Sequence, residues 1–179
     1  NPSVIPASEL GQGSRSSFSN WTTNKMARIV LFAGPTLNGL TERDLLLRDV
    51  LLLPPIERGD LPRFLHGDCP PIVVIADGRF HQCLAVGHRE IREVLETGRE
   101  VWGVSSMGAI RAYEMRMHGM KGFGTVYQRF VNAEARGDDF HDDEVSLLHE
   151  AEPPYRAASE PLVHLREALE RWQLKGYVT

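Results

Sequence analysis

The sequence predicts an α/β protein with a small, mostly parallel sheet, helices on both faces of that sheet and a single domain. Short apolar runs alternate with longer segments whose apolar residues recur at helical spacing. Glycine or proline follows most of these runs, which is typical of strand ends. The chain has 179 residues, enough for one domain with one hydrophobic core.

Four apolar runs are predicted to be strands. They lie at 29–33, 50–53, 72–76 and 101–104. The first is stopped by Gly34-Pro35, the second by Pro54-Pro55 and the third by Asp77-Gly78. Continuous apolar runs of this length are characteristic of strands that are buried on both faces of a parallel sheet.

Helical segments are predicted between and after these strands. They lie at 41–47, 61–65, 80–97, 106–118, 125–135, 142–150 and 159–173. Repeated strand–helix units imply a parallel sheet, because parallel strands need a crossover connection. Ligands bind outside the carboxyl ends of such strands, and the turns that follow the strands share one edge. We therefore expect Pro35, Thr36, Asp77 and Ser105 to contribute to a substrate-binding site there.

The turn after the fourth strand carries two serines and a glycine, in the order Ser105, Ser106, Met107, Gly108. A strand, a sharp turn of small residues and then a helix is the arrangement by which α/β hydrolases expose a serine hydroxyl. The N–H groups of the helix N-terminus can stabilise an oxyanion there. The simpler alternative is a serine that caps an ordinary helix. We predict that Ser106 is the reactive serine and that Ser105 supplies a supporting hydroxyl.

An ordered set of motifs resembles the TfuA-like family, whose members accompany YcaO enzymes in peptide-backbone thioamidation. The resemblance runs from about residue 27 to residue 169. Its motifs are LFAGPT (31–36), PPIERGDL (54–61), IADGRF (75–80), HREI (88–91), GVSSMGAIRA (103–112), GMKGFG (119–124), DDEV (142–145) and SEPLV (159–163). The resemblance implies a partner of a YcaO enzyme with a hydrolase-like site built on a Ser–Lys pair. Such a site would release sulfide from the thiocarboxylate of a ubiquitin-like sulfur-carrier protein, for use on a peptide substrate.

A nucleophilic serine needs a base, and three basic residues are candidates for a catalytic role beside it. Arg89 stands where the family commonly has lysine; arginine cannot take a proton but can hold an anion. His88 shares a helical stripe with Leu84 and Ile91 and is expected to face the sheet, either as a core histidine or as a catalytic one. Lys121 lies in a glycine-rich segment, either as an exposed loop charge or as a catalytic group.

Two further groups of charged residues each allow more than one interpretation. Arg111 and Glu114 are three residues apart, which favours a surface ion pair; the alternative is a site arginine that faces Asp77 and binds substrate. An acidic run at 138–144, with His141 and His149, allows three interpretations. It could bind a metal ion, it could form the charged first turn of a helix that Asp142 caps, or it could be an acidic surface that binds a basic partner. Of these, the helix turn is favoured, and no metal or cofactor is expected.

Composition points to a small cytoplasmic protein. The net charge of −4 argues against nucleic acid as a partner, and no apolar run approaches the length of a bilayer span. Cys69 and Cys83 form no metal-type pair, and we expect incidental thiols. Residues 1–25 lack a periodic apolar face and are expected to be a vector-derived or disordered leader before a domain at 26–179. A non-catalytic module that recruits the carrier or the peptide to YcaO is the alternative function.

Overall fold

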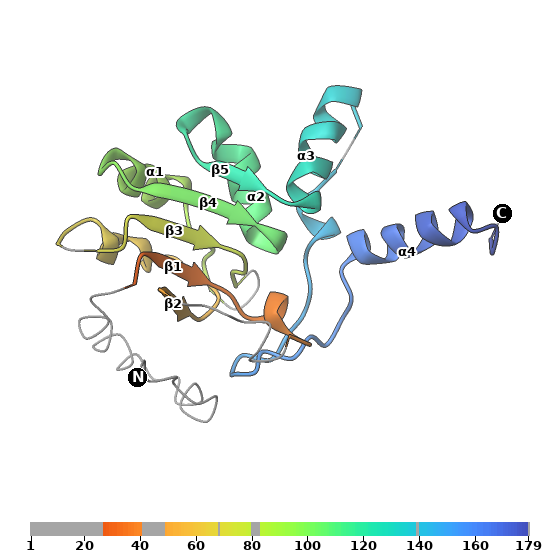
Figure 1. Ribbon diagram of the computed structural model, residues 1–179, viewed down its shortest axis with the longest axis horizontal. Coiled ribbons are helices and arrows are strands. Elements are labelled where there is room, and N and C mark those ends of the chain that lie inside the picture. The colour runs from red at the N-terminus through yellow and green to blue at the C-terminus, as the bar shows by residue number, and fades with distance from the viewer. Residues whose placement is uncertain (1–26, 41–48, 68, 80–82, 139, 179) are drawn as a thin grey trace.

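The computed structural model describes residues 27–40, 49–67, 69–79, 83–138 and 140–178. Five strands form one parallel sheet in the order β2–β1–β3–β4–β5 (Figure 1). The strands are β1 (Ile29–Phe32), β2 (Val50–Leu53), β3 (Ile72–Ile75), β4 (Glu100–Val104) and β5 (Lys121–Phe123). The predicted small α/β fold with a parallel sheet is confirmed.

One face of the sheet carries the main hydrophobic core. Alternate side chains of the central strands are buried on this face, as the period of two in a strand requires. Helices α1 (His88–Glu96) and α2 (Ser105–Met115) cover the same face, through Ile91 and Val94 of α1 and Met107 of α2. The strand residues in this core are Val30, Phe32, Val73, Ile75 and Val101.

Among the described helices, α1 and α2 therefore share one face of the sheet. Helix α3 (Thr125–Arg136) packs against α2 through a second cluster that includes Ile110 and Phe130. The helix predicted at 41–47 and the leader predicted at 1–25 lie outside the described residues.

Two predicted helices are shorter than their apolar periodicity suggests. The helix predicted at 80–97 begins only at His88, because the carbonyls of Leu84 and Ala85 accept hydrogen bonds from Arg58. The helix predicted at 142–150 is wrong: only a 3-10 turn, Asp142–Glu144, forms, and its N-cap is His141. Hydrogen bonds to distant groups replace the helical ones in both segments.

Strand β5 was missed in a segment predicted to be a glycine-rich turn. It pairs with β4 in parallel, with Trp102 opposite Lys121 and Val104 opposite Phe123. A strand of three residues with a central glycine is too short to show the alternation of apolar and polar residues that predicts a strand. The glycine is required by packing, because a Cβ at Gly122 would lie 2.2 Å from the ring of Tyr127.

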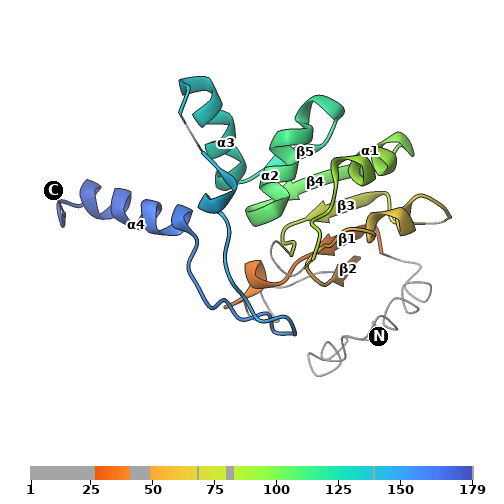
Figure 2. The ribbon, with the colours of Figure 1, turned by 180° about the vertical axis from the view of Figure 1, so that it is seen from behind.

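Residues 145–158, called the strap below, lead from the 3-10 turn to the last helix. The strap forms an antiparallel bridge between His149 and Ala157 and lies beside the turn that follows β1 (Figure 1). Helix α4 (Leu162–Leu174) then extends away from the sheet, as both ribbon views show (Figures 1 and 2). It begins three residues later than the helix predicted at 159–173.

Two glycines allow α2 to lie directly on the sheet. A Cβ at Gly108 would stand 1.8 Å from the carbonyl oxygen of Ile75, and a Cβ at Gly103 would stand 2.0 Å from the carbonyl oxygen of Gly108. The backbone N–H of Gly108 donates to the carbonyl of Ala76 at 3.1 Å. The start of α2, with its two serines, is thereby fixed against the end of β3.

We expect Gly108→Ala to destabilise the fold by more than about 3 kcal/mol, because the new methyl group collides with backbone that cannot move aside. Chemical unfolding measures the free energy. Gly87→Ala is the matched control: a Cβ at Gly87 meets its nearest atom at 3.6 Å, and we expect a loss below about 1 kcal/mol. Equal losses for the two variants would contradict the close approach of α2.

Candidate active site

A buried carboxyl group organises the carboxyl edge of the sheet. Asp77 follows β3 and is 2% exposed. Its Oδ2 accepts hydrogen bonds from the backbone N–H groups of Gly34 (2.7 Å) and Thr36 (2.9 Å). Its Oδ1 accepts a hydrogen bond of 2.6 Å from the hydroxyl of Thr36. These bonds satisfy a carboxyl group that would otherwise be costly to bury.

The position of Asp77 coincides with the switch point of the sheet. The connection that leaves β1 leads to β2 on one side, whereas the connection that leaves β3 leads to β4 on the other. Ligands of open parallel sheets bind where the connections diverge in this way. The predicted convergence of the turns after β1, β3 and β4 on one edge is confirmed.

The hydrogen bonds continue from Asp77 to a serine. The hydroxyl oxygens of Thr36 and Ser105 are 2.8 Å apart. Because Thr36 gives its only hydroxyl proton to Asp77, Ser105 must be the donor in this pair. The hydrogen-bonded chain Ser105–Thr36–Asp77 is called the serine relay below. Because Ser105 directs its hydroxyl proton to Thr36, the lone pairs of its oxygen point away from Thr36.

The two serines differ in backbone conformation. Ser105 has a φ of 58°, in the left-handed region that costs a non-glycine residue about 1–3 kcal/mol. Ser106 has φ −59° and ψ −112°, outside the helical region, although α2 formally begins at Ser105. A strained serine between a strand and a helix resembles the nucleophile elbow of α/β hydrolases. Both serine side chains are partly exposed.

The strap braces this edge from outside the sheet. The hydroxyl of Ser106 donates to the carbonyl of Val145 at 3.3 Å. The side-chain amide of Asn38 donates to the carbonyl of Tyr155 at 3.0 Å, and the ring of Tyr155 packs over Gly34. Burial raises the pKa of Tyr155 above its usual range. Residues far apart in the sequence therefore hold both the β1 turn and the serine turn.

The predicted basic partners lie apart from the serines. The side chain of Arg89 is 84% exposed and its Nε bonds Glu93 at 2.8 Å, which raises the pKa of the guanidinium. The expectation that His88 faces the sheet is wrong, because its side chain is 53% exposed and bonds Glu114 at 2.7 Å. The histidine sits in the first turn of α1, where the stripe of apolar residues has not yet begun.

Lys121 is held near the opposite edge of the sheet. Its Nζ lies 3.0 Å from Glu100, the first residue of β4, and 5.0 Å from the ring centre of Trp102. The pKa of Glu100 is lowered, first by the hydrogen bond from Trp102 and then by Lys121. Ser105 follows the other end of this five-residue strand, about 15 Å away at the usual rise per residue.

Arg111 forms the predicted surface ion pair. Its Nη1 lies 2.5 Å from Glu114, the same carboxylate that binds His88, and its Nε donates to the carbonyl of Val86 at 3.0 Å. These contacts leave Arg111 tied to the start of α1. No described contact joins it to Asp77, and Pro35, Thr36, Asp77 and Ser105 are the predicted residues that the structure brings together.

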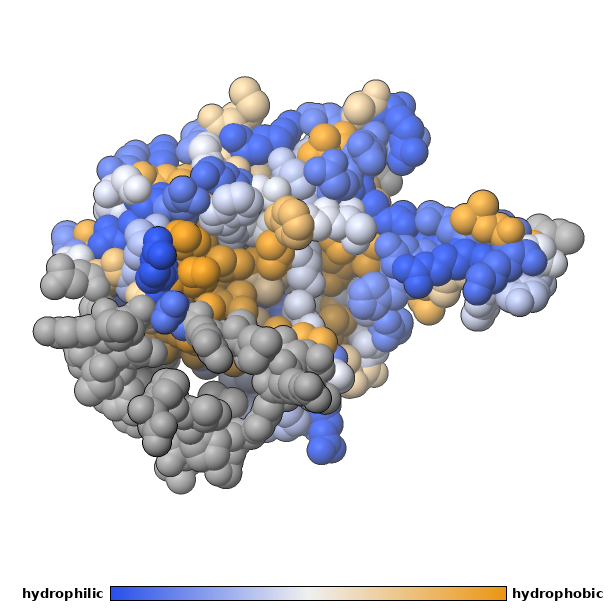
Figure 3. Space-filling view, in the orientation of Figure 1, coloured by the Kyte–Doolittle hydropathy of each residue, from blue (hydrophilic) through white to orange (hydrophobic). Residues whose placement is uncertain are grey.

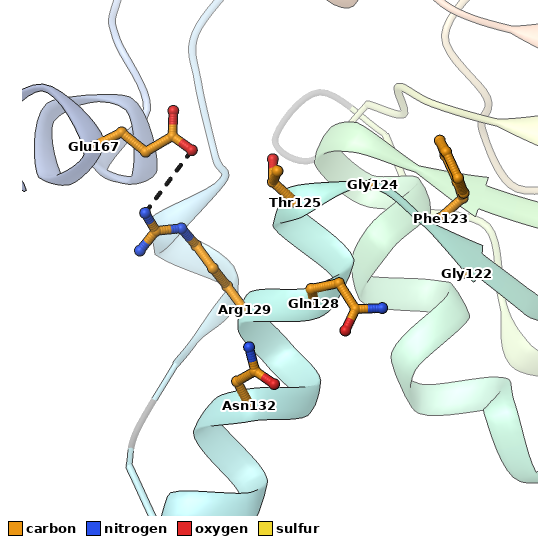
Figure 4. Close-up of a pocket in the computed structure, with 8 residues that line it drawn as sticks. All are labelled: Gly122, Phe123, Gly124, Thr125, Gln128, Arg129, Asn132 and Glu167. Carbon is orange, nitrogen blue, oxygen red and sulfur yellow. Dashed lines mark ion pairs between the residues drawn. The ribbon is translucent and has the colours of Figure 1, made fainter. Parts of the chain in front are cut away.

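An open pocket of about 520 Å³ lies at the end of β5 (Figure 4). It is formed by the end of β5, the start of α3 and Glu167 of α4. Phe123 is opposite Val104 in the sheet register, so the pocket adjoins the residue that precedes Ser105. The amide side chains of Gln128 and Asn132 line it, and neither has a hydrogen-bond partner among the described residues. The sequence analysis missed this pocket because its wall includes β5, and the three residues of β5 are too few to show a strand pattern.

The acidic run is divided among several contacts. Glu144 is buried and forms a bidentate pair with Arg166 of α4, with distances of 2.7–3.0 Å. Asp138 pairs with Arg136 at 2.9 Å. In the described part of the chain, no group of three or more His, Cys, Asp or Glu side chains is placed to hold a metal ion.

The two cysteines lie outside the serine relay. The thiol of Cys69 bonds the carbonyl of His66 at 3.0 Å. The pKa of Cys83 is raised to about 11, first by burial and then by the side chain of Glu57. No helix in the described residues has the length and apolar character needed to cross a bilayer.

Comparison with known proteins identifies the family. The model of the TfuA-like protein family matches residues 77–179, which is more than half of the chain. The match begins at Asp77 and includes the serine turn, β5, the strap and α4. A search of curated proteins finds no match. The chain therefore belongs to the TfuA-like family.

Proposed function

We propose that this protein is an accessory protein of YcaO-dependent peptide-backbone thioamidation, and that it hydrolyses the thiocarboxylate of a ubiquitin-like sulfur-carrier protein to supply sulfide. Membership of the TfuA-like family implies the association with YcaO. The hydrolytic step is supported by one observation above all: a strained serine, Ser105, bonded through Thr36 to a buried carboxylate at the switch point of the sheet.

The proposed reaction has two steps. A serine hydroxyl attacks the thiocarboxylate carbon, forms an ester with the carrier and expels sulfide, which leaves with the hydroxyl proton as hydrosulfide. Water then cleaves the ester, restores the hydroxyl and releases the carrier as its carboxylate with one proton. The N–H groups at the start of α2 are suited to the oxyanion of each step.

Two serines are candidates for the nucleophile. Ser106 is the residue that the sequence favours. Two observations favour Ser105 instead: its position in the serine relay, and its left-handed φ at the strand–helix turn. The hydroxyl of Ser106 is directed to the carbonyl of Val145, which suits a bracing role.

The pocket beside Phe123 suits the extended tail of a carrier. Phe123, which lines the pocket, ends β5 at the edge of the sheet where Ser105 follows β4, so a tail bound there has its end near the serine turn. The amide groups of Gln128 and Asn132 can donate to and accept from a peptide backbone in that pocket (Figure 4).

A binding module without catalysis is the second candidate function. It is favoured by the positions of Arg89, His88 and Lys121, which pair with Glu93, Glu114 and Glu100 rather than with a serine. Such a module would hold the carrier or the peptide for the YcaO enzyme. Sulfide release by the purified protein from a thiocarboxylated carrier, without YcaO, separates the two functions.

We expect Ser105→Ala to lower sulfide release at least about 100-fold, because the ester can no longer form. Ser106→Ala is the matched control and should keep the rate within about tenfold, since it loses a hydrogen bond worth about 1 kcal/mol. The midpoint of thermal unfolding should fall by no more than about 4 °C in either variant, as the loss of one hydrogen bond predicts. If Ser105→Ala releases sulfide at the wild-type rate and Ser106→Ala does not, the nucleophile is Ser106. If the wild-type protein itself releases no sulfide, the binding module is favoured.

We expect Arg89→Lys to leave sulfide release within about twofold between pH 6 and 9. The position is exposed, so a lysine there keeps a pKa near the usual value of about 10.4 and stays protonated. The pH profile of the rate is the measurement. A rate that rises in the variant would show that this position supplies the base.

We expect Cys83 to be a poor nucleophile at neutral pH. Raising the pKa of a thiol keeps it protonated, so the reactive thiolate of Cys83 becomes abundant only as the pH approaches about 11. In a Cys69→Ser variant, alkylation by iodoacetamide at pH 9 should be on the order of 100-fold slower than that of free cysteine. Alkylation with a midpoint near pH 8.5 would contradict this, and loss of sulfide release in Cys83→Ser would show that the thiol takes part.

A further inference from the structure

Helix α4 exposes large apolar side chains in a regular row. Leu162, Leu165, Leu169 and Trp172, called the apolar stripe below, are between 41% and 51% exposed. Their spacing of three, four and three residues is that of the a and d positions of a coiled coil. A row of this kind on one side of a helix is suited to packing against another apolar surface.

The opposite side of α4 attaches the helix to the body. Val163 is buried, Arg166 binds Glu144, and Arg129 of α3 binds both Glu167 and Glu170. At 100° per residue, the apolar stripe is centred roughly 130° from these attached side chains. It therefore faces away from the body, along the arm that Figures 1 and 3 show.

This arrangement reverses the usual amphipathic helix. A helix at the surface of a monomer turns its apolar side to the core and its charges to water. In α4 the carboxylates of Glu167 and Glu170 and the guanidinium of Arg166 form ion pairs with the body. The leucines and the tryptophan of the stripe face solvent instead. The apolar stripe is therefore an exposed apolar patch of the kind that marks an interaction site.

The charges that border the apolar stripe are basic. Arg171 and Lys175 lie along one flank of the stripe. Arg171 is exposed and lies 3.6 Å from Glu167, a carboxylate that it shares with Arg129, and His164 in the first turn pairs with Glu160. The acidic residues of α4 itself, Glu167 and Glu170, are both paired with Arg129 on the body side. A second copy of α4 packed antiparallel on the stripe would bring the two flanks with Arg171 and Lys175 together, which is unfavourable. Charge complementarity instead selects a partner surface whose apolar groove is bordered by Asp and Glu.

We infer that the apolar stripe docks α4 into an acidic-rimmed apolar groove of the YcaO enzyme, an inference that rests on the proposed function. Strand arrowheads point to the side of the molecule from which α4 extends (Figure 1). A partner on α4 thus sits at the edge where sulfide would be released. Because sulfide is small and diffuses quickly, the reaction that consumes it benefits from an enzyme held at this edge.

The test measures the affinity of the purified YcaO partner enzyme for the full-length chain, for example by biolayer interferometry. We expect Leu165→Gln/Leu169→Gln to weaken binding at least tenfold. Leu174→Gln is the matched control, because Leu174 is 88% exposed on the same helix but lies off the stripe; its affinity should be unchanged. Arg171→Glu/Lys175→Glu should also weaken binding and reduce its dependence on salt.

Other outcomes separate the possible failures. Equal affinity of the double glutamine variant and the wild type overturns the docking surface but leaves the proposed function intact. No binding of YcaO to the wild type contradicts the proposed function itself. A wild-type dimer in sedimentation that the double glutamine variant converts to monomer would mean that a second copy covers the stripe. A fall in the unfolding temperature of the double variant would mean that the stripe packs within the chain.

Discussion

The carboxyl group of Asp77 is the constraint on which the rest of this edge depends. A buried carboxylate must be met by donors, and here they come from the turn that follows β1, through Gly34 and Thr36. The same bonds bring the hydroxyl of Thr36 to Ser105 and so connect three strand ends. Without this carboxylate, the donors of the β1 turn would have no acceptor, and nothing would hold the serine hydroxyl against that turn.

The strands of the sheet could be read from the sequence because each is a short apolar run with a clear stop. The four predicted strands match β1 to β4 within one residue at either end. Helices α2 and α3 were predicted almost as closely, since their apolar residues keep one period. The prediction failed where tertiary hydrogen bonds replace local ones, as at Leu84 and Val145, and where a strand is too short to show a period, as at β5.

The candidate site was predictable in part for a topological reason. Parallel strands end at one edge, so Thr36, Asp77 and Ser105 had to be neighbours once the strands were known. The partners of charged side chains were not predictable in this way, because Arg89, His88 and Lys121 each find a carboxylate close by. The left-handed backbone of Ser105 also has no sequence signal, since serine carries no preference for it.

The strap is synthesised after the strands and the serine turn that it contacts. All five strands precede Val145, so the sheet, the serine relay and the close contact of α2 with β3 involve only the first 123 residues. The acceptor for the Ser106 hydroxyl and the ring that covers Gly34 come later, from Val145 and Tyr155. A nascent chain that has just completed its sheet therefore holds both serines in a turn without these contacts until the ribosome has added residues 145–155.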